Sequence, residues 1–355
     1  MDEFARRTPD AFAPVRLGFV GCGALTRKHL RALRRIPSIE VVAVADLSES
    51  LRERVAEQFE VPGRYAGADE LLAHPGLDAV ASVVPAPVKA EVALAALGAD
   101  KHVLFEKPLA GTIEDAERIE EAARRSRGRA LMGFHIVFHR LIAEAMELVE
   151  AGRVGEVESI HTSWFSPSEA HARRGEGALT DLGSHCFDLW RRFSGAEVER
   201  VWAQSIGREE VASVNARMTN GVLATGVFSI RTTHEIEVEV CGTLGRLRVS
   251  GQRFDGLELL PLGTTPGALQ QRVAYLRSLP RVAMDAVRDA RCGGIYMDSI
   301  RRQWLHFAEV AQGRAEPVCT AADGKQALAI TLAARASARD GGVARPIATE
   351  APAYC

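Results

Sequence analysis

The chain has 355 residues, of which 47% are hydrophobic and 25% are charged, and its formal net charge is −2. This length exceeds one ordinary domain, so we expect two. The near-neutral charge gives no reason to expect nucleic acid or an anionic membrane as a partner. No apolar run approaches the roughly 20 residues that cross a bilayer, and the N-terminal arm 1–14 lacks the apolar core of a signal peptide. A soluble, cytoplasmic protein is therefore expected.

Cysteine and lysine usage narrows the chemistry further. The six cysteines are scattered without C-x-x-C spacing, which argues against a zinc knuckle or a disulfide framework, and we predict no metal. Lysine is scarce, so a mechanistic lysine has few candidates. The five are Lys28, Lys89, Lys101, Lys107 and Lys325.

The first third of the chain alternates apolar runs with segments of helical spacing. The runs predict strands at 15–20, 41–45, 79–84, 102–105 and 130–134, and the spacing predicts helices at 24–36, 51–59, 68–73, 89–96 and 112–126. Such alternation indicates a doubly wound parallel sheet with helices on both faces. We predict an α/β Rossmann domain over residues 15–135.

A glycine pair, Gly21-x-Gly23, stands at the junction of the first strand and the first helix. A tight turn there directs backbone N–H groups and the positive helix end at a pyrophosphate. Asp46 ends the second strand, where an acid hydrogen-bonds the adenosine ribose. Thr26 departs from the pattern, because a third glycine or alanine usually lets helix and strand pack closely. A Gly-x-Gly pair alone is more often an ordinary turn, but together these features predict a dinucleotide site. Its expected residues are Gly21, Cys22, Gly23, Ala24, Leu25, Asp46, Val84, Pro85, Glu106 and Lys107.

The residues around Asp46 also predict which dinucleotide binds. A carboxylate there accepts from ribose hydroxyls and repels a 2′-phosphate, and Leu47 offers no guanidinium to receive one. We therefore predict NAD as the cofactor in preference to NADP.

Two further motifs fall at predicted strand ends. Val84-Pro85 and Glu106-Lys107-Pro108 follow apolar strands, and ligands of such sheets gather outside the carboxyl ends of the strands. Proline restricts the backbone of Lys107 to extended conformations and so limits where its side chain begins. The alternative for Lys107 is a solvated loop lysine, the usual fate of this residue type.

The composition changes after residues 141–151, which read as a connecting helix. Strand patterns are predicted at 157–165, 198–206, 211–218, 222–230 and 235–241, and the last alternates glutamate with apolar residues, which indicates one wet and one dry face. We predict a second, α+β domain over 136–342 with a largely antiparallel, open-faced sheet, followed by a tail, 343–355. Its dry face needs cover from helices or from another subunit.

Within this domain, residues 179–193 read as one helix that carries Asp181, His185 and Asp188 at spacing i, i+4, i+7, and hence on one face. Gly183 and Ser184 are small, so a bulky group could approach closely. Alternatives are a favourable acid at a helix N-terminus with a core histidine, or a metal pair that lacks a third ligand at a recognised spacing. We interpret Cys186, which points elsewhere, as packing.

Taken together, these motifs resemble the Gfo/Idh/MocA family, which comprises glucose–fructose oxidoreductase, inositol dehydrogenase and related sugar dehydrogenases. The similarity runs over about 15–347. It is carried by Gly21-Cys22-Gly23, the strand ending in Asp46, Val84-Pro85 before Lys89, residues 101–108, Gly133-Phe134-His135, Gly155-Glu156-Val157, residues 177–185 and residues 240–245. Two departures are Lys89, where a histidine is common, and Val137, where many members carry arginine.

The resemblance implies that Lys107, Asp181 and His185 act together in hydride transfer between NAD and a hydroxyl carbon of a sugar, sugar derivative or cyclitol. It also implies a cis bond before Pro108, and a homodimer or homotetramer formed through the second-domain sheet. In this mechanism His185 takes the hydroxyl proton, and Lys107 stabilises charge on the oxygen and assists proton transfer. Asp181 orients His185 or holds a neighbouring hydroxyl.

Two other functions remain open: an NAD-dependent, redox-neutral glycoside hydrolase or lyase, and a dinucleotide-sensing regulator without chemistry. The substrate site is expected to include Lys107, His135, Trp164, Asp181 and His185. Residues 262–294 read as a helical segment interrupted by Pro280 that shapes either the pocket or a subunit contact. The sequence does not reveal which polyol binds or the direction of the reaction.

Overall fold

The computed structural model describes residues 13–167, 177–253, 255–265 and 268–348, so most of the predicted arm 1–14 and part of the predicted tail 343–355 lie outside the described residues. The chain forms two compact units. The first contains Met1–His135 and Ile300–Lys325, and the second contains Ile136–Ser299 and Gln326–Cys355. The sequence assigned residues 300–325 to the second domain, whereas the structure groups them with the first unit.

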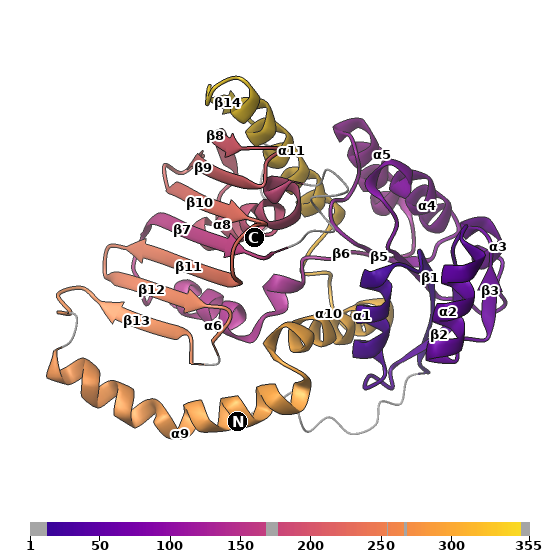
Figure 1. Ribbon diagram of the computed structural model, residues 1–355, viewed down its shortest axis with the longest axis horizontal. Coiled ribbons are helices and arrows are strands. Elements are labelled where there is room, and N and C mark those ends of the chain that lie inside the picture. Colours follow the sequence, from indigo (N-terminus) through magenta and orange to yellow (C-terminus); the bar gives the residue numbers. More distant parts are fainter. Residues whose placement is uncertain (1–12, 168–176, 254, 266–267, 349–355) are drawn as a thin grey trace. The chain divides into compact units, whose positions relative to one another are not determined.

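The first unit contains a six-stranded sheet in the order β3-β2-β1-β4-β5-β6 (Figure 1). Its strand pairs are all parallel. This order and direction define a doubly wound Rossmann sheet, whose strand order reverses between β1 and β4. The strands are β1 (Val15–Val20), β2 (Ile39–Ala45), β3 (Gly63–Tyr65), β4 (Ala79–Ser82), β5 (His102–Phe105) and β6 (Ala130–Met132). The helices between them are α1 (Ala24–Leu33), α2 (Glu49–Phe59), α3 (Ala68–Leu72), α4 (Ala86–Gly98) and α5 (Ile113–Arg125).

The core of this unit explains why residues 300–325 belong to it. Trp304 and Phe307 of α10 (Ile295–Ala311) are fully buried. The Trp304 ring lies 5.7 Å from that of Phe19 in β1 and 5.6 Å from that of His29 in α1, measured between ring centroids. Aromatic burial of this size stabilises the contact of α10 with the Rossmann sheet.

The second unit contains an eight-stranded sheet in the order β13-β12-β11-β7-β10-β9-β8-β14, as the predicted α+β class requires (Figure 1). The pair β7–β10 is parallel and the other pairs are antiparallel. The strands are β7 (Val157–Phe165), β8 (Val198–Ile206), β9 (Val211–Met218), β10 (Leu223–Ser229), β11 (Glu235–Gly242), β12 (Gly245–Ser250), β13 (Leu257–Pro261) and β14 (Arg345–Pro346). The other elements of this part of the chain are η2 (His135–Phe138), α6 (Arg140–Glu150), η3 (Leu179–Gly183), α8 (Ser184–Ser194), α9 (Leu269–Cys292) and α11 (Ala321–Arg339).

Helices cover one face of this sheet. In β11, buried Ile236, Val238 and Val240 alternate with half-buried glutamates, as their spacing predicts. On the covered face, the indole N–H of Trp190 in α8 donates to Thr162 Oγ1 in β7 at 3.2 Å, and Ser337 of α11 accepts from the backbone N–H of Ala203 in β8. The dry face is therefore covered by helices of the same chain.

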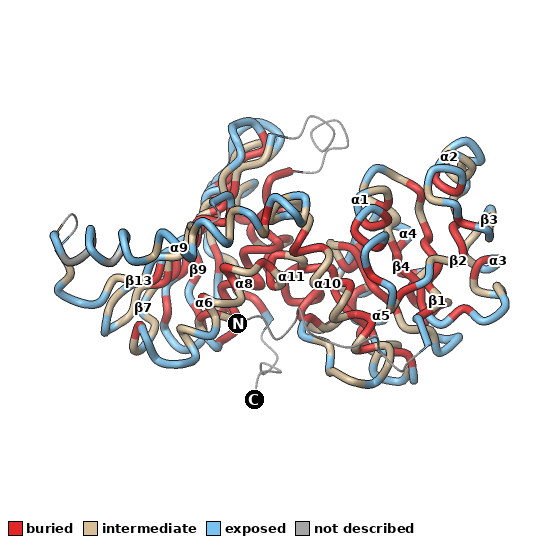
Figure 2. Tube along the Cα trace, turned by 90° about the horizontal axis from the view of Figure 1, so that it is seen from below, coloured by how far each residue is buried: buried red, intermediate tan, exposed pale blue. Residues whose placement is uncertain are grey.

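Helix α9 differs from the other helices in its exposure. It is continuous over Leu269–Cys292 with Pro280 inside it, so the predicted interruption at Pro280 is wrong. Its outward side is pale blue in Figure 2, and several large apolar side chains on it are solvent-exposed, including Leu276 at 61% and Met284 at 68%. Ion pairs of Arg140 with Asp285 and Asp289, and of Glu144 with Arg281, join its C-terminal half to α6.

Two features are absent from the part of the chain that the structure describes. No helix there combines the length and apolar character needed to cross a membrane. No group of three or more His, Cys, Asp or Glu side chains in the described ranges is placed to hold a metal ion.

Candidate active site

The glycine turn after β1 has the geometry that a dinucleotide requires. Gly21 has φ of +98°, and a Cβ there would lie 2.4 Å from the carbonyl oxygen of Val83, so only glycine fits. A Cβ at Gly23 would meet nothing within 4 Å. Gly23 is also the N-cap of α1 and makes no side-chain capping hydrogen bond. The N-terminus of α1 is thus open to an anionic group.

Asp46 joins the ends of β1 and β2. Its carboxylate accepts from the backbone N–H of Cys22 at 2.7 Å and from that of Ser48 at 2.8 Å. The glycine turn and Asp46 are the two parts of the predicted dinucleotide fingerprint, and they contact each other. This is the arrangement expected when the turn binds the phosphates and the acid binds the ribose. Burial, with a further contribution from Asp46, raises the pKa of the Cys22 thiol to about 12, so this cysteine stays protonated.

Thr26 fits where a third glycine was expected. Its side chain is fully buried, and its hydroxyl donates to the carbonyl oxygen of Gly21 at 2.6 Å. The hydroxyl therefore fastens the first turn of α1 to the glycine turn.

Arg52 of α2 is a residue that the sequence analysis missed. Its guanidinium donates to the backbone carbonyl of Asp46 at 3.0 Å and lies 3.4 Å from Glu53. These contacts hold the Arg52 guanidinium beside the backbone of Asp46, just after β2. The signal that could have found it is an arginine six residues after Asp46, the acid that the sequence predicts to bind the ribose.

Taken together, these features fit a bound dinucleotide. The turn accepts no side chain at Gly21, the helix N-terminus beyond it is uncapped, and Asp46 carries carboxylate oxygens at the end of the neighbouring strand.

The segment after β5 carries Lys107. The Lys107–Pro108 peptide is cis, which confirms that prediction. The N–H of Glu106 donates to Ser82 at the end of β4, and the N–H of Lys107 lies 3.3 Å from its acceptor, Glu106 Oε2. The side chain of Lys107 therefore begins at a stretch of backbone that is hydrogen-bonded to the carboxyl end of β4.

Glu106 is buried beside a histidine, which in turn contacts a tryptophan. His29 Nε2 lies 3.1 Å from Glu106 Oε1, and His29 Nδ1 accepts from the indole N–H of Trp304 at 3.0 Å. An accepting Nδ1 leaves the ring proton on Nε2, the atom that faces Glu106. Burial raises the pKa of Glu106, but the hydrogen bond to His29 and the electrostatic interactions with His29, His135 and Lys107 outweigh it, so the net pKa lies below the ordinary value.

Lys89 lies in the first turn of α4 and is only 1% exposed. Its Nζ donates to the backbone carbonyl of Pro108 at 2.6 Å and to that of Glu106. The sequence analysis counted Lys89 among the five lysines and noted it as a departure from the family pattern, but assigned it no role.

In the second unit, His185 lies in the first turn of helix α8 and is 2% exposed. Its ring stacks on Trp164 of β7 with centroids 5.0 Å apart and planes at 22°. Asp181 lies in η3, a turn of π-helix that precedes α8 directly. The predicted single α-helix is therefore wrong at its start, and π-helical turns are frequent at functional sites.

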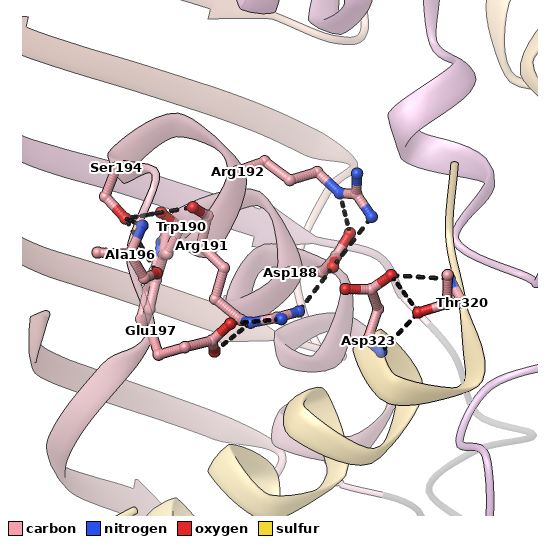
Figure 3. A network of polar contacts seen from close by, with 9 residues as sticks. All are labelled: Asp188, Trp190, Arg191, Arg192, Ser194, Ala196, Glu197, Thr320 and Asp323. Carbon is pink, nitrogen blue, oxygen red and sulfur yellow. Dashed lines mark hydrogen bonds and ion pairs between the residues drawn. The ribbon is translucent and has the colours of Figure 1, made fainter. Parts of the chain in front are cut away.

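Asp188 belongs to a buried ion-pair network. It is fully buried and forms ion pairs with Arg191 at 3.3 Å and Arg192 at 2.7 Å. Arg191 in turn donates to both oxygens of Glu197 (Figure 3). This buried network joins α8 to the start of β8, which indicates a structural role for Asp188.

The small residues between Asp181 and His185 are not open space. A Cβ at Gly183 would lie 3.0 Å from the ring of Phe187, and the Ser184 hydroxyl donates to Thr180. The expectation that a bulky ligand approaches there is therefore wrong. Cys186 is 1% exposed, and burial raises the pKa of its thiol to about 12. Both observations fit the interpretation of Cys186 as a residue that packs in the core.

The remaining expected positions divide between the two units. Lys107, Val84 and Pro85 lie at strand ends of the first unit, and His135 begins η2 close enough to lower the pKa of Glu106. Asp181, His185 and Trp164 belong to the second unit. Val137, in place of a common arginine, is buried.

Comparison with known proteins identifies the family. Residues 15–134 match the oxidoreductase family with an NAD-binding Rossmann fold, GFO/IDH/MocA, and residues 142–248 match the GFO/IDH/MocA C-terminal domain. The chain is 33% identical to a dTDP-3,4-didehydro-2,6-dideoxy-alpha-D-glucose 3-reductase of Actinomadura kijaniata, covering 66% of this chain and 74% of the relative. It is 26% identical to a myo-inositol 2-dehydrogenase of Thermotoga maritima, covering 91% and 96%.

Solved structures share the fold. The scyllo-inositol dehydrogenase of Lactobacillus casei, solved with NAD(H) and scyllo-inositol, superposes with a TM-score of 0.76 at 20% identity over 95% of this chain and all of the other. The WlbA dehydrogenase of Bordetella pertussis, solved with NADH and UDP-GlcNAcA, gives 0.80 at 22% identity over 96% and 100%. The chain belongs to the Gfo/Idh/MocA oxidoreductase family, and its first unit is an NAD-binding Rossmann fold.

Proposed function

We propose that this chain is an NAD-dependent dehydrogenase that acts on a hydroxyl carbon of a sugar, a sugar derivative or a cyclitol. Support comes from the family membership and from relatives named as an inositol dehydrogenase and a nucleotide-sugar reductase. The observation that carries the proposal is Lys107, which the NAD-binding unit presents at the carboxyl end of β5, the edge where ligands of such sheets bind.

The proposed cofactor-binding residues are those of the glycine turn and the neighbouring strand ends. Gly21, Gly23 and the first turn of α1 receive the pyrophosphate, and Asp46 receives the ribose hydroxyls. Bound NAD supplies the acceptor for the hydride that leaves the alcohol carbon. The carboxylate of Asp46 favours NAD over NADP because it repels a 2′-phosphate.

The proposed chemistry of the chain's own side chains concerns the proton and the charge on the alcohol oxygen. His185 accepts the hydroxyl proton, because an imidazole titrates near neutral pH. Stacking on Trp164 holds the plane of its ring. The Lys107 ammonium stabilises negative charge that develops on the oxygen, and Asp181 orients His185 or a neighbouring hydroxyl. Trp164 and His135 contribute to the substrate site.

We further propose that subunits associate through the uncovered face of the second-unit sheet. This face presents exposed apolar side chains such as Val227 at 43% beside charged ones. Native mass spectrometry is expected to show a homodimer or homotetramer, and a monomer at micromolar concentration would contradict the proposal.

A substrate panel tests the reaction. Initial rates of NADH formation should be measured with NAD and, in turn, myo-inositol, scyllo-inositol, glucose, glucose 6-phosphate and UDP-N-acetylglucosamine, and at least one should give sustained turnover. With the best of these, Lys107→Ala should lower kcat by roughly 10²–10⁴-fold, because an acid–base or electrostatic group is lost. NAD affinity should change by less than about threefold.

Lys101→Ala is the matched control, because Lys101 lies at the opposite, amino end of β5 and donates to the Leu77 carbonyl. It should keep near-normal turnover. Near-normal kcat in Lys107→Ala under saturating substrate would contradict the assignment of Lys107.

A further inference from the structure

The backbone around Lys107 lies beyond the end of a β-ladder. Pairing of β4 with β5 ends at Ser82 and Phe105, and the next N–H, that of Glu106, still donates to Ser82. After this bond the chain has left the ladder. Buried carbonyl groups in such a segment need another donor, because a buried carbonyl without one costs free energy.

Lys89 is that donor on both sides of Lys107. Its Nζ donates to the carbonyl of Glu106, the residue before Lys107, and to the carbonyl of Pro108, the residue after it, at 2.6 Å. One ammonium group therefore bridges the carbonyls of the two residues that flank Lys107. The N–H of Lys107 itself is directed to the Glu106 carboxylate.

The position of Lys89 is unfavourable for a lysine in two respects. Its side chain is almost completely buried, and burial of an ammonium group is costly. It also lies in the first turn of α4, where the helix dipole disfavours a cation and where no acidic residue is present. An apolar side chain would suit the helix better, so the hydrogen bonds to residues 106 and 108 are the physical reason for a lysine here.

We propose that Lys89 is a positioning residue for Lys107: its ammonium group bridges the carbonyls of Glu106 and Pro108 and so holds the backbone from which Lys107 enters the site. This inference rests on the proposed function of Lys107. Supporting contacts of this kind matter because a displacement of about 1 Å can cost on the order of 10² in rate.

The first test measures the backbone directly. Lys89→Met keeps an unbranched side chain of similar length and removes the donors. Hydrogen–deuterium exchange of the peptide that spans residues 103–112 should become faster in this variant, while peptides of the second unit remain unchanged. Lys101→Met is the matched control. Lys101 also donates to a backbone carbonyl, that of Leu77, but it lies at the amino end of β5, opposite to Lys107. Unchanged exchange at 103–112 in Lys89→Met would overturn the proposal.

The second test measures coupling to Lys107. With the most active polyol of the panel, Lys89→Met should lower kcat by about 10–100-fold and change the NAD dissociation constant by less than about threefold. In the Lys107→Ala background the same substitution should have almost no further effect on kcat, because both act through one group. Equal losses in the two backgrounds would contradict a positioning role.

Conservative variants keep the proposal testable if Lys89→Met does not fold. Lys89→Arg retains charge and donors, and Lys89→Gln retains a neutral donor, so kcat should recover in the order Arg, then Gln, then Met. If all three had the same kcat, the bridge would be irrelevant to Lys107. The outcomes also separate the two proposals: faster exchange at 103–112 with normal kcat in both Lys89→Met and Lys107→Ala would overturn the function of Lys107, whereas a large loss in Lys107→Ala alone would overturn the role of Lys89.

Discussion

At the scale of single residues, Asp46 has two tasks in one place. Its carboxylate holds the backbone N–H of Cys22 in the glycine turn, and it is the acid expected to receive the adenosine ribose. The neighbouring residue, Leu47, is 91% exposed, so its side chain buries little surface. The specificity for NAD is therefore open to change by a substitution that costs little packing.

We predict that Asp46→Ser combined with Leu47→Arg shifts the preference toward NADP. Removal of the carboxylate abolishes repulsion of a 2′-phosphate, and a guanidinium supplies charged hydrogen bonds of about 1.5–3 kcal/mol, or roughly 10–100-fold. The measurement is the ratio of kcat/KM for NADP to that for NAD. Leu47→Arg alone is the control and should shift the ratio less, and a double variant with the wild-type ratio would show that Asp46 does not select the cofactor.

Several residue contacts in the site could not be predicted from the sequence. Gly21, Gly23 and Asp46 stand at fixed places relative to strands, so a local pattern predicts their roles. The contacts of Lys89 with residues 106 and 108, and of His29 with Glu106 and Trp304, join positions far apart along the chain. No local periodicity carries that information, because these contacts arise only when the sheet assembles.

At the scale of elements, strong periodicity and strand length decide what the sequence predicts. Strands β1, β5, β7, β8 and β9 have the predicted bounds, because each is a clear apolar or alternating run. The short strand β3 and strands β12 and β13 were not predicted; β3 has three residues and β12 begins at a glycine in the positive φ region. Pro280 does not end α9, because proline removes one helical hydrogen bond without forbidding helical φ.

Helix α9 leads to a prediction about local stability. Its C-terminal half is joined to α6 through Arg140, Asp285 and Asp289, whereas Leu269, Tyr275 and Leu276 in its N-terminal half are more than half exposed. A helical segment with few buried contacts opens locally. We expect backbone amides of residues 272–279 to exchange with deuterium faster than those of 283–292. Equal, strong protection along the helix would instead indicate that a partner covers its N-terminal half, the subunit contact that the sequence left open.

At the scale of the whole molecule, the chain is organised as two units that the linear sequence does not separate cleanly. The break after residue 135 is visible in the sequence as a change from alternating strands and helices to successive strands. The grouping of residues 300–325 with the first unit is not, because it depends on burial of Trp304 against Phe19 and His29. The family assignment is the same for both units, since each matches its own GFO/IDH/MocA domain.

The central proposal is that Lys107 and His185 act on one alcohol group. The most direct measurement is a crystal structure of the enzyme with NAD and the polyol that gives the highest rate. The account predicts Lys107 Nζ and the His185 imidazole within about 2.7–3.2 Å of the same substrate hydroxyl, with Asp181 beside them. A complex in which the two side chains face different pockets, or in which the polyol binds away from Lys107, would contradict it.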